Sequence, residues 1–137
     1  MGILSWFFRT GKKSEPIVKI NGPGTFSIDV VGESNYQYNL ESICGGKTED
    51  SQNIVVTAIL IHEDNNRYDN KAILVSIYGK PVGYLSRDNA RQFRQRLAEE
   101  GFAGLGAICQ AKIVGGWRRD KNNEGHFGVK LDLPTQK

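Results

Sequence analysis

Cysteine and histidine are scarce in this chain, and their scarcity limits the chemistry open to it. The 137 residues include two cysteines and two histidines. Cys44 and Cys109 each lie beside apolar residues and form no Cys-x-x-Cys pair, so we expect free, buried thiols in a reducing compartment. A disulfide framework and a zinc site are both excluded by this spacing. Neither His62 nor His126 has a nucleophile motif near it, so nothing indicates Ser/His/Asp catalysis.

Long apolar runs are also absent. The run from Ile3 to Phe8 is too short to cross a bilayer, and the basic residues follow it, whereas a signal peptide carries them first. We expect its aromatic residues, Trp6, Phe7 and Phe8, to dock on the domain or on a partner. A weak membrane-surface anchor is the alternative. The sequence therefore predicts a cytoplasmic protein without a membrane span.

Enzyme motifs are missing as well. No Gly-x-x-x-x-Gly-Lys-Ser/Thr loop is present, which excludes a P-loop ATPase. The consecutive residues His62, Glu63 and Asp64, which Asp69 could join, are of metal-ligand type. Neighbours on an extended strand point to opposite faces, however, so a solvated strand end is favoured over a metal site or a metal-dependent nuclease. We predict no catalytic site, no bound metal and no cofactor.

The composition that is present is that of one globular domain. Hydrophobic residues make up 39% of the chain and charged residues 24%, and the net charge is only +3. The positive charge gathers in residues 87–96 and 112–121. We expect residues 1–24 to form an aromatic and basic lead-in, irregular from residue 11 onward, and residues 25–134 to form the domain.

Short β-strands dominate the predicted domain. Apolar residues alternate from Phe26 to Val30, as in a half-buried strand, and a β-branched run from Ile54 to Ile61 predicts a strand covered on both faces. Further strands are expected at 72–78, 82–85, 107–114 and 126–133, with a basic hairpin loop at 115–125. Short strands joined by glycine-rich turns indicate a mainly β fold, a small OB-like, partly open β-barrel, with one or two helices.

The clearest helix follows Ser86, a good N-cap residue, and Gly101 is suited to end it. Ala90, Phe93 and Leu97 recur at helical spacing and predict the buried face. A second, short helix is expected at 36–43.

Arginines and tyrosines mark the candidate binding surface. Three arginines recur on one face of the predicted helix, and three tyrosines lie at the ends of neighbouring elements. These residues are Arg87, Arg91 and Arg94, and Tyr36, Tyr68 and Tyr84. A solvated helix face is the plain alternative. Bases stack on aromatic rings with about 1–3 kcal/mol each while cations meet the phosphates, so the combination favours a surface for single-stranded nucleic acid.

Three segments resemble the HIRAN domain, in the order and spacing of that family. They are Val31–Gln37 (VGESNYQ), Glu63–Ile73 (EDNNRYDNKAI) and Val82–Arg87 (VGYLSR), and the resemblance extends over residues 25–134. It implies a modified OB-like barrel. In eukaryotic DNA-repair translocases this domain captures a free 3′ end of single-stranded DNA with an aromatic-lined pocket and an acidic residue. No helicase segment follows here, so the chain resembles the stand-alone form found in bacteria.

The resemblance also implies roles for individual residues. Tyr68 would stack on a terminal base, Asp69 would accept a hydrogen bond from the 3′-hydroxyl and Arg87 would hold a phosphate. Tyr36 would supply a second ring, and Tyr84 would close the site. Asp69 has a plainer alternative, which is to cap its own turn. Ser34 and Asn35 stand where the eukaryotic form has an arginine and a further aromatic residue.

The sequence thus predicts a DNA-binding module with a role in DNA repair or at replication forks, and a helicase or nuclease is the kind of protein partner expected. The alternative is a protein-interaction adaptor that docks through its basic face and its N-terminal aromatic segment.

Overall fold

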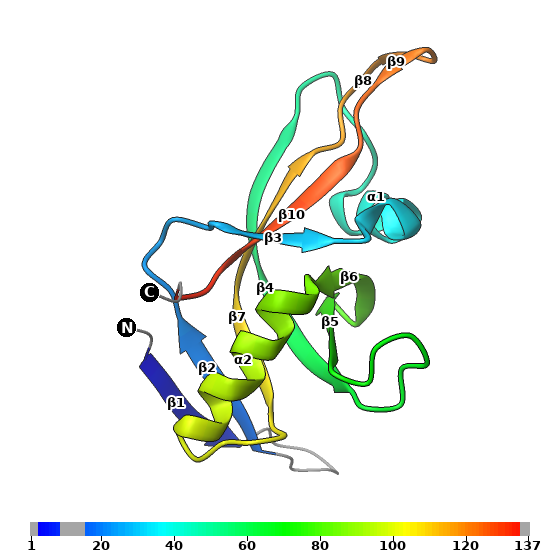
Figure 1. The fold of residues 1–137 in the computed structure, drawn as a ribbon. Coiled ribbons are helices and arrows are strands. Elements are labelled where there is room, and N and C mark those ends of the chain that lie inside the picture. Colours follow the sequence, from blue (N-terminus) through cyan, green and yellow to red (C-terminus); the bar gives the residue numbers. More distant parts are fainter. Residues whose placement is uncertain (1–2, 9–15, 135–137) are drawn as a thin grey trace.

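Ten strands and two α-helices make up the computed structural model, which describes residues 3–8 and 16–134, with side chains from residue 17 onward (Figure 1). The strands are β1 (Ile3–Phe8), β2 (Pro16–Asn21), β3 (Ile28–Val31), β4 (Gln52–Glu63), β5 (Ala72–Ile77), β6 (Lys80–Leu85), β7 (Gly106–Gly115), β8 (Arg118–Asp120), β9 (Asn123–Glu124) and β10 (Phe127–Asp132). The helices are α1 (Gln37–Cys44), preceded by a 3-10 turn at Glu33–Tyr36, and α2 (Arg87–Glu99). The mainly β class predicted from the sequence is confirmed.

Six strands close into an antiparallel barrel in the order β7-β10-β3-β6-β5-β4, with β4 returning to β7. The β4–β7 ladder is long, extending from Gln52 opposite Gly115 to Leu60 opposite Ala107. By contrast, β3 is held by only two residue pairs on each side, to β10 and to β6. The predicted small OB-like barrel is therefore confirmed, and its closure is thinnest at β3.

Strand β4 corrects one expectation. Its inward residues Val56, Ala58 and Leu60 are buried in the barrel core, but the outward Val55 and Ile61 are 54% and 39% exposed. The prediction of a strand covered on both faces is therefore wrong. A strand of an antiparallel barrel buries one face only, and β-branched residues are tolerated on the outer face because they suit the pleated backbone.

Strand β2 corrects a second expectation. The predicted irregular segment instead contains β2, which pairs in parallel with β7 from Ile17 opposite Gly106 onward. Val18 and Ile20 are buried in the core. Strand β1 pairs antiparallel with β2 and extends the sheet beyond the barrel (Figure 1). The predicted docking of the Trp6, Phe7 and Phe8 side chains lies outside the described side chains.

Helix α2 forms as predicted. The Ser86 hydroxyl oxygen accepts a hydrogen bond from the backbone N–H of Asn89 at 3.1 Å, and Ala90, Phe93 and Leu97 are buried. Gly101, with φ of +88°, lies just beyond the end of the helix. This anchoring fixes the exposed face of α2 relative to the barrel.

Several smaller expectations can also be compared with the structure. The predicted short helix is α1, and the basic loop at 115–125 contains the ribbon formed by β8 and β9. Both cysteines are free, but only Cys109 is buried, whereas Cys44 is half-buried. Within the described residues, neither helix is long and apolar enough to cross a membrane.

Candidate nucleic-acid interface

The loop between β4 and β5, residues 64–71, is shaped by Asn66. Its Oδ1 atom accepts hydrogen bonds from the backbone N–H groups of Tyr68 at 2.8 Å and of Asp69 at 3.0 Å. Its Nδ2 atom donates to Glu63 Oε1 at 3.0 Å, which ties the loop to the end of β4. Asparagine favours such turns because its side chain replaces a backbone acceptor. The loop therefore presents its tip in a defined conformation.

Tyr68 lies at that tip with 82% of its surface exposed. Its ring contributes nothing to the core, as the polar surroundings predict. The Arg67 guanidinium carbon lies 5.4 Å from the ring centroid, within cation–π range. The ring is thus an exposed aromatic surface on a hydrogen-bonded loop.

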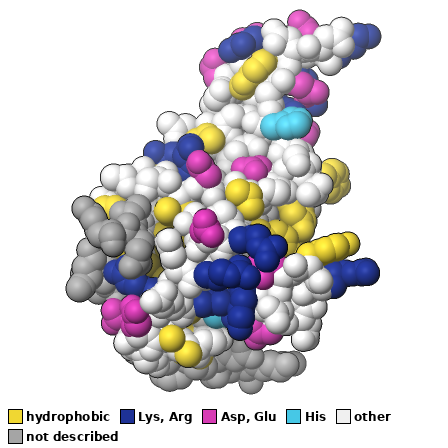
Figure 2. Space-filling view, viewed as in Figure 1, with side chains coloured by type: hydrophobic (Ala, Val, Ile, Leu, Met, Phe, Trp, Pro, Cys, Tyr) yellow, Lys and Arg dark blue, Asp and Glu magenta, His cyan; other side chains and the backbone are white. Residues whose placement is uncertain are grey.

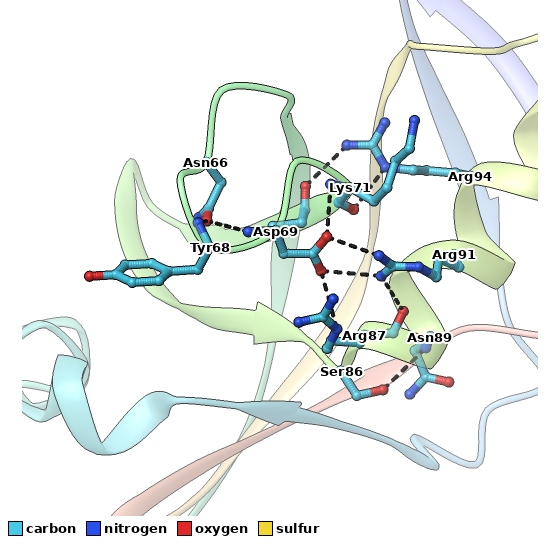
Figure 3. Close-up of polar contacts among 10 residues, drawn as sticks. Asn66, Tyr68, Asp69, Lys71, Ser86, Arg87, Asn89, Arg91 and Arg94 are labelled. Carbon is cyan, nitrogen blue, oxygen red and sulfur yellow. Dashed lines mark hydrogen bonds and ion pairs between the residues drawn. The ribbon is translucent and has the colours of Figure 1, made fainter.

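Asp69 joins this loop to α2 (Figure 3). Its two carboxylate oxygens accept from Arg91 Nη2 and Nη1, both at 3.1 Å, in a bidentate pair. Asp69 Oδ1 also accepts from the backbone N–H of Lys71 at 3.0 Å, so the residue does cap its turn. Arg87 Nε lies 3.9 Å from Oδ2. The hydrogen bond from Arg91, followed by that from Lys71, lowers the pKa of Asp69 to about 2. The carboxylate is therefore ionised throughout the physiological range.

The three arginines of α2 differ in how much of their charge faces solvent. Arg87 has an exposed side chain, at 70%, and Arg91 is 44% exposed. Arg94 is only 19% exposed, because it donates from Nε to the Lys71 carbonyl at 2.8 Å and pairs with Asp64 at 2.9 Å. Arg94 is mainly a tie between α2 and the start of β5. Arg87 is the arginine best placed to meet a phosphate.

Tyr84 contacts Glu63, and Tyr36 is a neighbour of Tyr84. The Tyr84 hydroxyl donates to Glu63 Oε1 at 2.7 Å, and Glu63 also receives the bond from Asn66. Burial raises the pKa of Tyr84, and the neighbouring Glu63 and Tyr36 raise it further. Both tyrosines are half-buried, so Tyr84 acts first as a support of the β4–β5 loop.

Glu63 is the functional neighbour that sequence reasoning missed. It stands between His62 and Asp64 in a run of metal-ligand residue types, and it was therefore considered as a metal ligand and not as a hydrogen-bond acceptor. The signal available in the sequence was an acidic residue at a strand end, with Tyr84 expected on a neighbouring strand and Asn66 three residues away.

No metal-binding group forms in the described part of the chain, where no three histidine, cysteine, aspartate or glutamate side chains come together. His62 Nε2 lies 2.7 Å from the Leu105 carbonyl oxygen, Asp64 pairs with Arg94, and Asp69 pairs with Arg91. The residues considered for a nuclease site thus have separate partners.

The predicted site residues lie in one region, where Asp69 contacts Arg87 and Arg91, Glu63 contacts Tyr84, and Arg94 contacts Asp64. Figure 2 shows a dark-blue cluster of lysine and arginine side chains over α2, with hydrophobic side chains beside it on the side of the β4–β5 loop. Gly83 lies in β6 directly before Tyr84, where a Cβ atom would meet Val30 and the backbone of Val31. Glycine at this position therefore lets β3 and β6 approach closely.

Comparisons with known proteins add no relative. No protein-family model matches the chain, and neither the curated proteins nor the solved structures contain a significant match. The resemblance to the HIRAN domain remains a prediction that rests on the residues named above.

Proposed function

We propose that the chain is a non-catalytic module that binds single-stranded DNA, preferentially at a free 3′ end, in DNA repair or at replication forks. The observation that carries the proposal is an exposed Tyr68 ring on a hydrogen-bonded loop that the next residue, Asp69, ties to the arginines of α2. A ring that serves no core is available for a base. The neighbouring cations are available for the phosphates.

A bound strand would use Tyr68 and Arg87 together. Arg67 lies over the Tyr68 ring, and a base would stack on the free part of the ring surface. Arg87 is the most exposed of the three arginines, and its contact with Asp69 is long, at 3.9 Å. Its remaining donors can therefore turn to a backbone phosphate without breaking a short hydrogen bond.

Asp69 supports a preference for a hydroxyl end. A carboxylate has about four acceptor positions, and Arg91 and Lys71 occupy three of those on Asp69. The fourth would accept the 3′-hydroxyl, and a 3′-phosphate would place a second anion beside the carboxylate. A hydrogen bond to a charged group corresponds to a selectivity of roughly tenfold or more.

The test is a fluorescence-anisotropy titration with short oligonucleotides that carry a 3′-hydroxyl, a 3′-phosphate or blocked ends, each with and without a divalent metal. We expect binding that weakens as salt rises, strongest for the 3′-hydroxyl strand, with no strand shortened by the metal. The absence of oligonucleotide binding at low salt would overturn the proposal and leave the adaptor alternative. Metal-dependent shortening would point to the nuclease alternative.

A further inference from the structure

A cavity of about 380 Å³ opens beside the arginines, at the junction of α2, the end of β4 and the loop that follows α2. Its lining contains three cationic side chains and no carboxylate. The lining residues are His62, Lys71, Arg91, Arg94, Gln95, Ala103 and Gly104. Tyr68 is not among them, so the cavity is separate from the stacking surface proposed above.

Carboxylates lie around this cavity but not in its lining, and one of them, Glu99, accepts a hydrogen bond from Gln95 Nε2 at 3.1 Å. Arg91 pairs with Asp69 and Arg94 with Asp64, and both carboxylates lie outside the lining. Among the residues that the structure describes, no carboxylate lies within ion-pair distance of Lys71. Like charges held close together repel each other, and an anion between them would relieve that repulsion.

The side chains of Lys71 and Arg94 extend alongside each other in Figure 3. Arg94 uses Nε and Nη2 for the carbonyls of Lys71 and Ala72 and for Asp64. Its Nη1 group has no hydrogen-bond partner within the described residues, and Lys71 keeps the donors of its ammonium group. These donors are the types that bind phosphate oxygens in proteins.

His62 forms the polar wall of the cavity. Because its Nε2 atom donates to the Leu105 carbonyl, Nδ1 carries the lone pair of the neutral ring, and this atom is buried without a partner in the described part of the chain. Burial lowers the pKa of His62, and Arg94 lowers it further, whereas the Leu105 carbonyl and Asp64 act in the opposite direction. Lys71 and Arg91 also line the cavity. The ring centroids of His62 and Phe93 lie 5.9 Å apart.

We propose that this cavity binds a phosphate group, held by the ammonium of Lys71 and the outer guanidinium of Arg94. The group is either free phosphate or the 5′-terminal phosphate of a nucleotide chain, since the function proposed above disfavours a 3′-phosphate beside Asp69. This inference does not depend on the stacking role of Tyr68. An anion placed against His62 favours the imidazolium form, so occupancy raises the pKa of this histidine.

The experiment follows the ring signals of His62 by NMR in the full chain while inorganic phosphate is added at constant ionic strength. We expect the His62 pKa to rise with phosphate and not with chloride. Lys71→Gln should weaken phosphate binding by about tenfold, the loss expected for one charge-assisted hydrogen bond. Lys80→Gln is the matched control, because it removes the same charge at the opposite end of the β5–β6 hairpin. It should bind phosphate as the wild type does.

A second arm compares oligonucleotides that differ only in a 5′-terminal phosphate and thereby identifies the source of the group. A His62 shift with the phosphorylated strand alone assigns the cavity to a strand end, and a shift with inorganic phosphate alone assigns it to the free anion. Equal responses to phosphate and chloride, or full retention of binding by Lys71→Gln, would overturn the inference. Oligonucleotide binding without any His62 response to phosphate would overturn the inference about the cavity and leave the proposed function standing. A His62 response to phosphate without oligonucleotide binding would support the cavity and overturn the proposed function.

Discussion

Two regions of this molecule are rich in basic side chains, but one lies on a helix packed against the barrel and the other on a two-stranded ribbon. The arginines of α2 lie on a helix packed against the barrel and are oriented by Asp69 and Asp64. The ribbon of β8 and β9 extends away from the barrel (Figure 1), and its Arg118 shares Glu124 with Lys47. Two short strands form a marginal unit by themselves. A local run of positive charge in the sequence therefore does not say whether the scaffold fixes the direction of its side chains.

The largest expected effect is on stability, and a pair of glycine substitutions compares the barrel with the ribbon of β8 and β9. Gly83→Ala should lower the stability of the whole fold by about 1–3 kcal/mol, because a Cβ atom there meets Val30 and the backbone of Val31. At Gly125, the new Cβ atom would meet the indole ring of Trp117 at the edge of the ribbon, a side chain rather than backbone. Thermal unfolding followed by circular dichroism should show a larger drop for Gly83→Ala than for Gly125→Ala. Equal drops would mean that the ribbon is as firmly integrated as the barrel.

Asp69→Asn should have the next largest effect. The amide loses the charge that pairs with Arg91 and weakens the acceptor offered to a 3′-hydroxyl, so the roughly tenfold preference for a hydroxyl end over a phosphate end should disappear. Competition between the two oligonucleotide types measures this directly. An unchanged preference in Asp69→Asn would assign Asp69 to the turn and to Arg91 alone.

The two regions can also be compared through salt dependence. If Arg87 meets a phosphate, Arg87→Ala should reduce the slope of log affinity against log salt by roughly 0.7, the value for one phosphate of a single strand. Arg119→Ala removes a ribbon arginine whose guanidinium carbon lies 4.6 Å from the Trp117 ring centroid. It should leave the slope unchanged. A larger reduction for Arg119→Ala than for Arg87→Ala would move the interface to the ribbon.

Lowering the pH should produce the smallest effect, a loss of stability through Asp69. The pKa of Asp69 falls from an ordinary value of 3.8 to about 2 in the folded chain, so its contribution to stability is complete above about pH 4 and disappears as the pH falls towards 2. Lys47 and Arg118 likewise lower the pKa of Glu124 in the ribbon. Urea unfolding at neutral pH and near pH 3 should show a smaller acid sensitivity in Asp69→Asn than in the wild type. An identical loss in both would deny Asp69 this contribution.

Local patterns predicted the elements of this fold because their causes are local. The cap at Ser86 and the buried spacing of Phe93 and Leu97 act within α2. The exposure of Tyr68 follows from its polar neighbours alone. The parallel pairing of β2 with β7 was missed because the partners lie about ninety positions apart and the strand is short.

The contacts of the site residues could not be predicted from the sequence for a similar reason. Helical spacing makes Arg87, Arg91 and Arg94 equivalent, whereas the fold brings Asp69 to Arg91 and backbone carbonyls to Arg94 across more than twenty positions. No periodicity carries that information. The sequence could therefore propose the surface but not assign which arginine is most exposed.

The most direct test of the central claim is the oligonucleotide affinity of Tyr68→Ala, with thermal unfolding measured on the same samples. Tyr38→Ala is the matched control, because Tyr38 is 85% exposed but lies on α1. We expect Tyr68→Ala to lose about 1–3 kcal/mol of binding free energy with its melting temperature unchanged, and Tyr38→Ala to bind as the wild type does. Wild-type affinity in Tyr68→Ala, or an equal loss in Tyr38→Ala, would contradict the account.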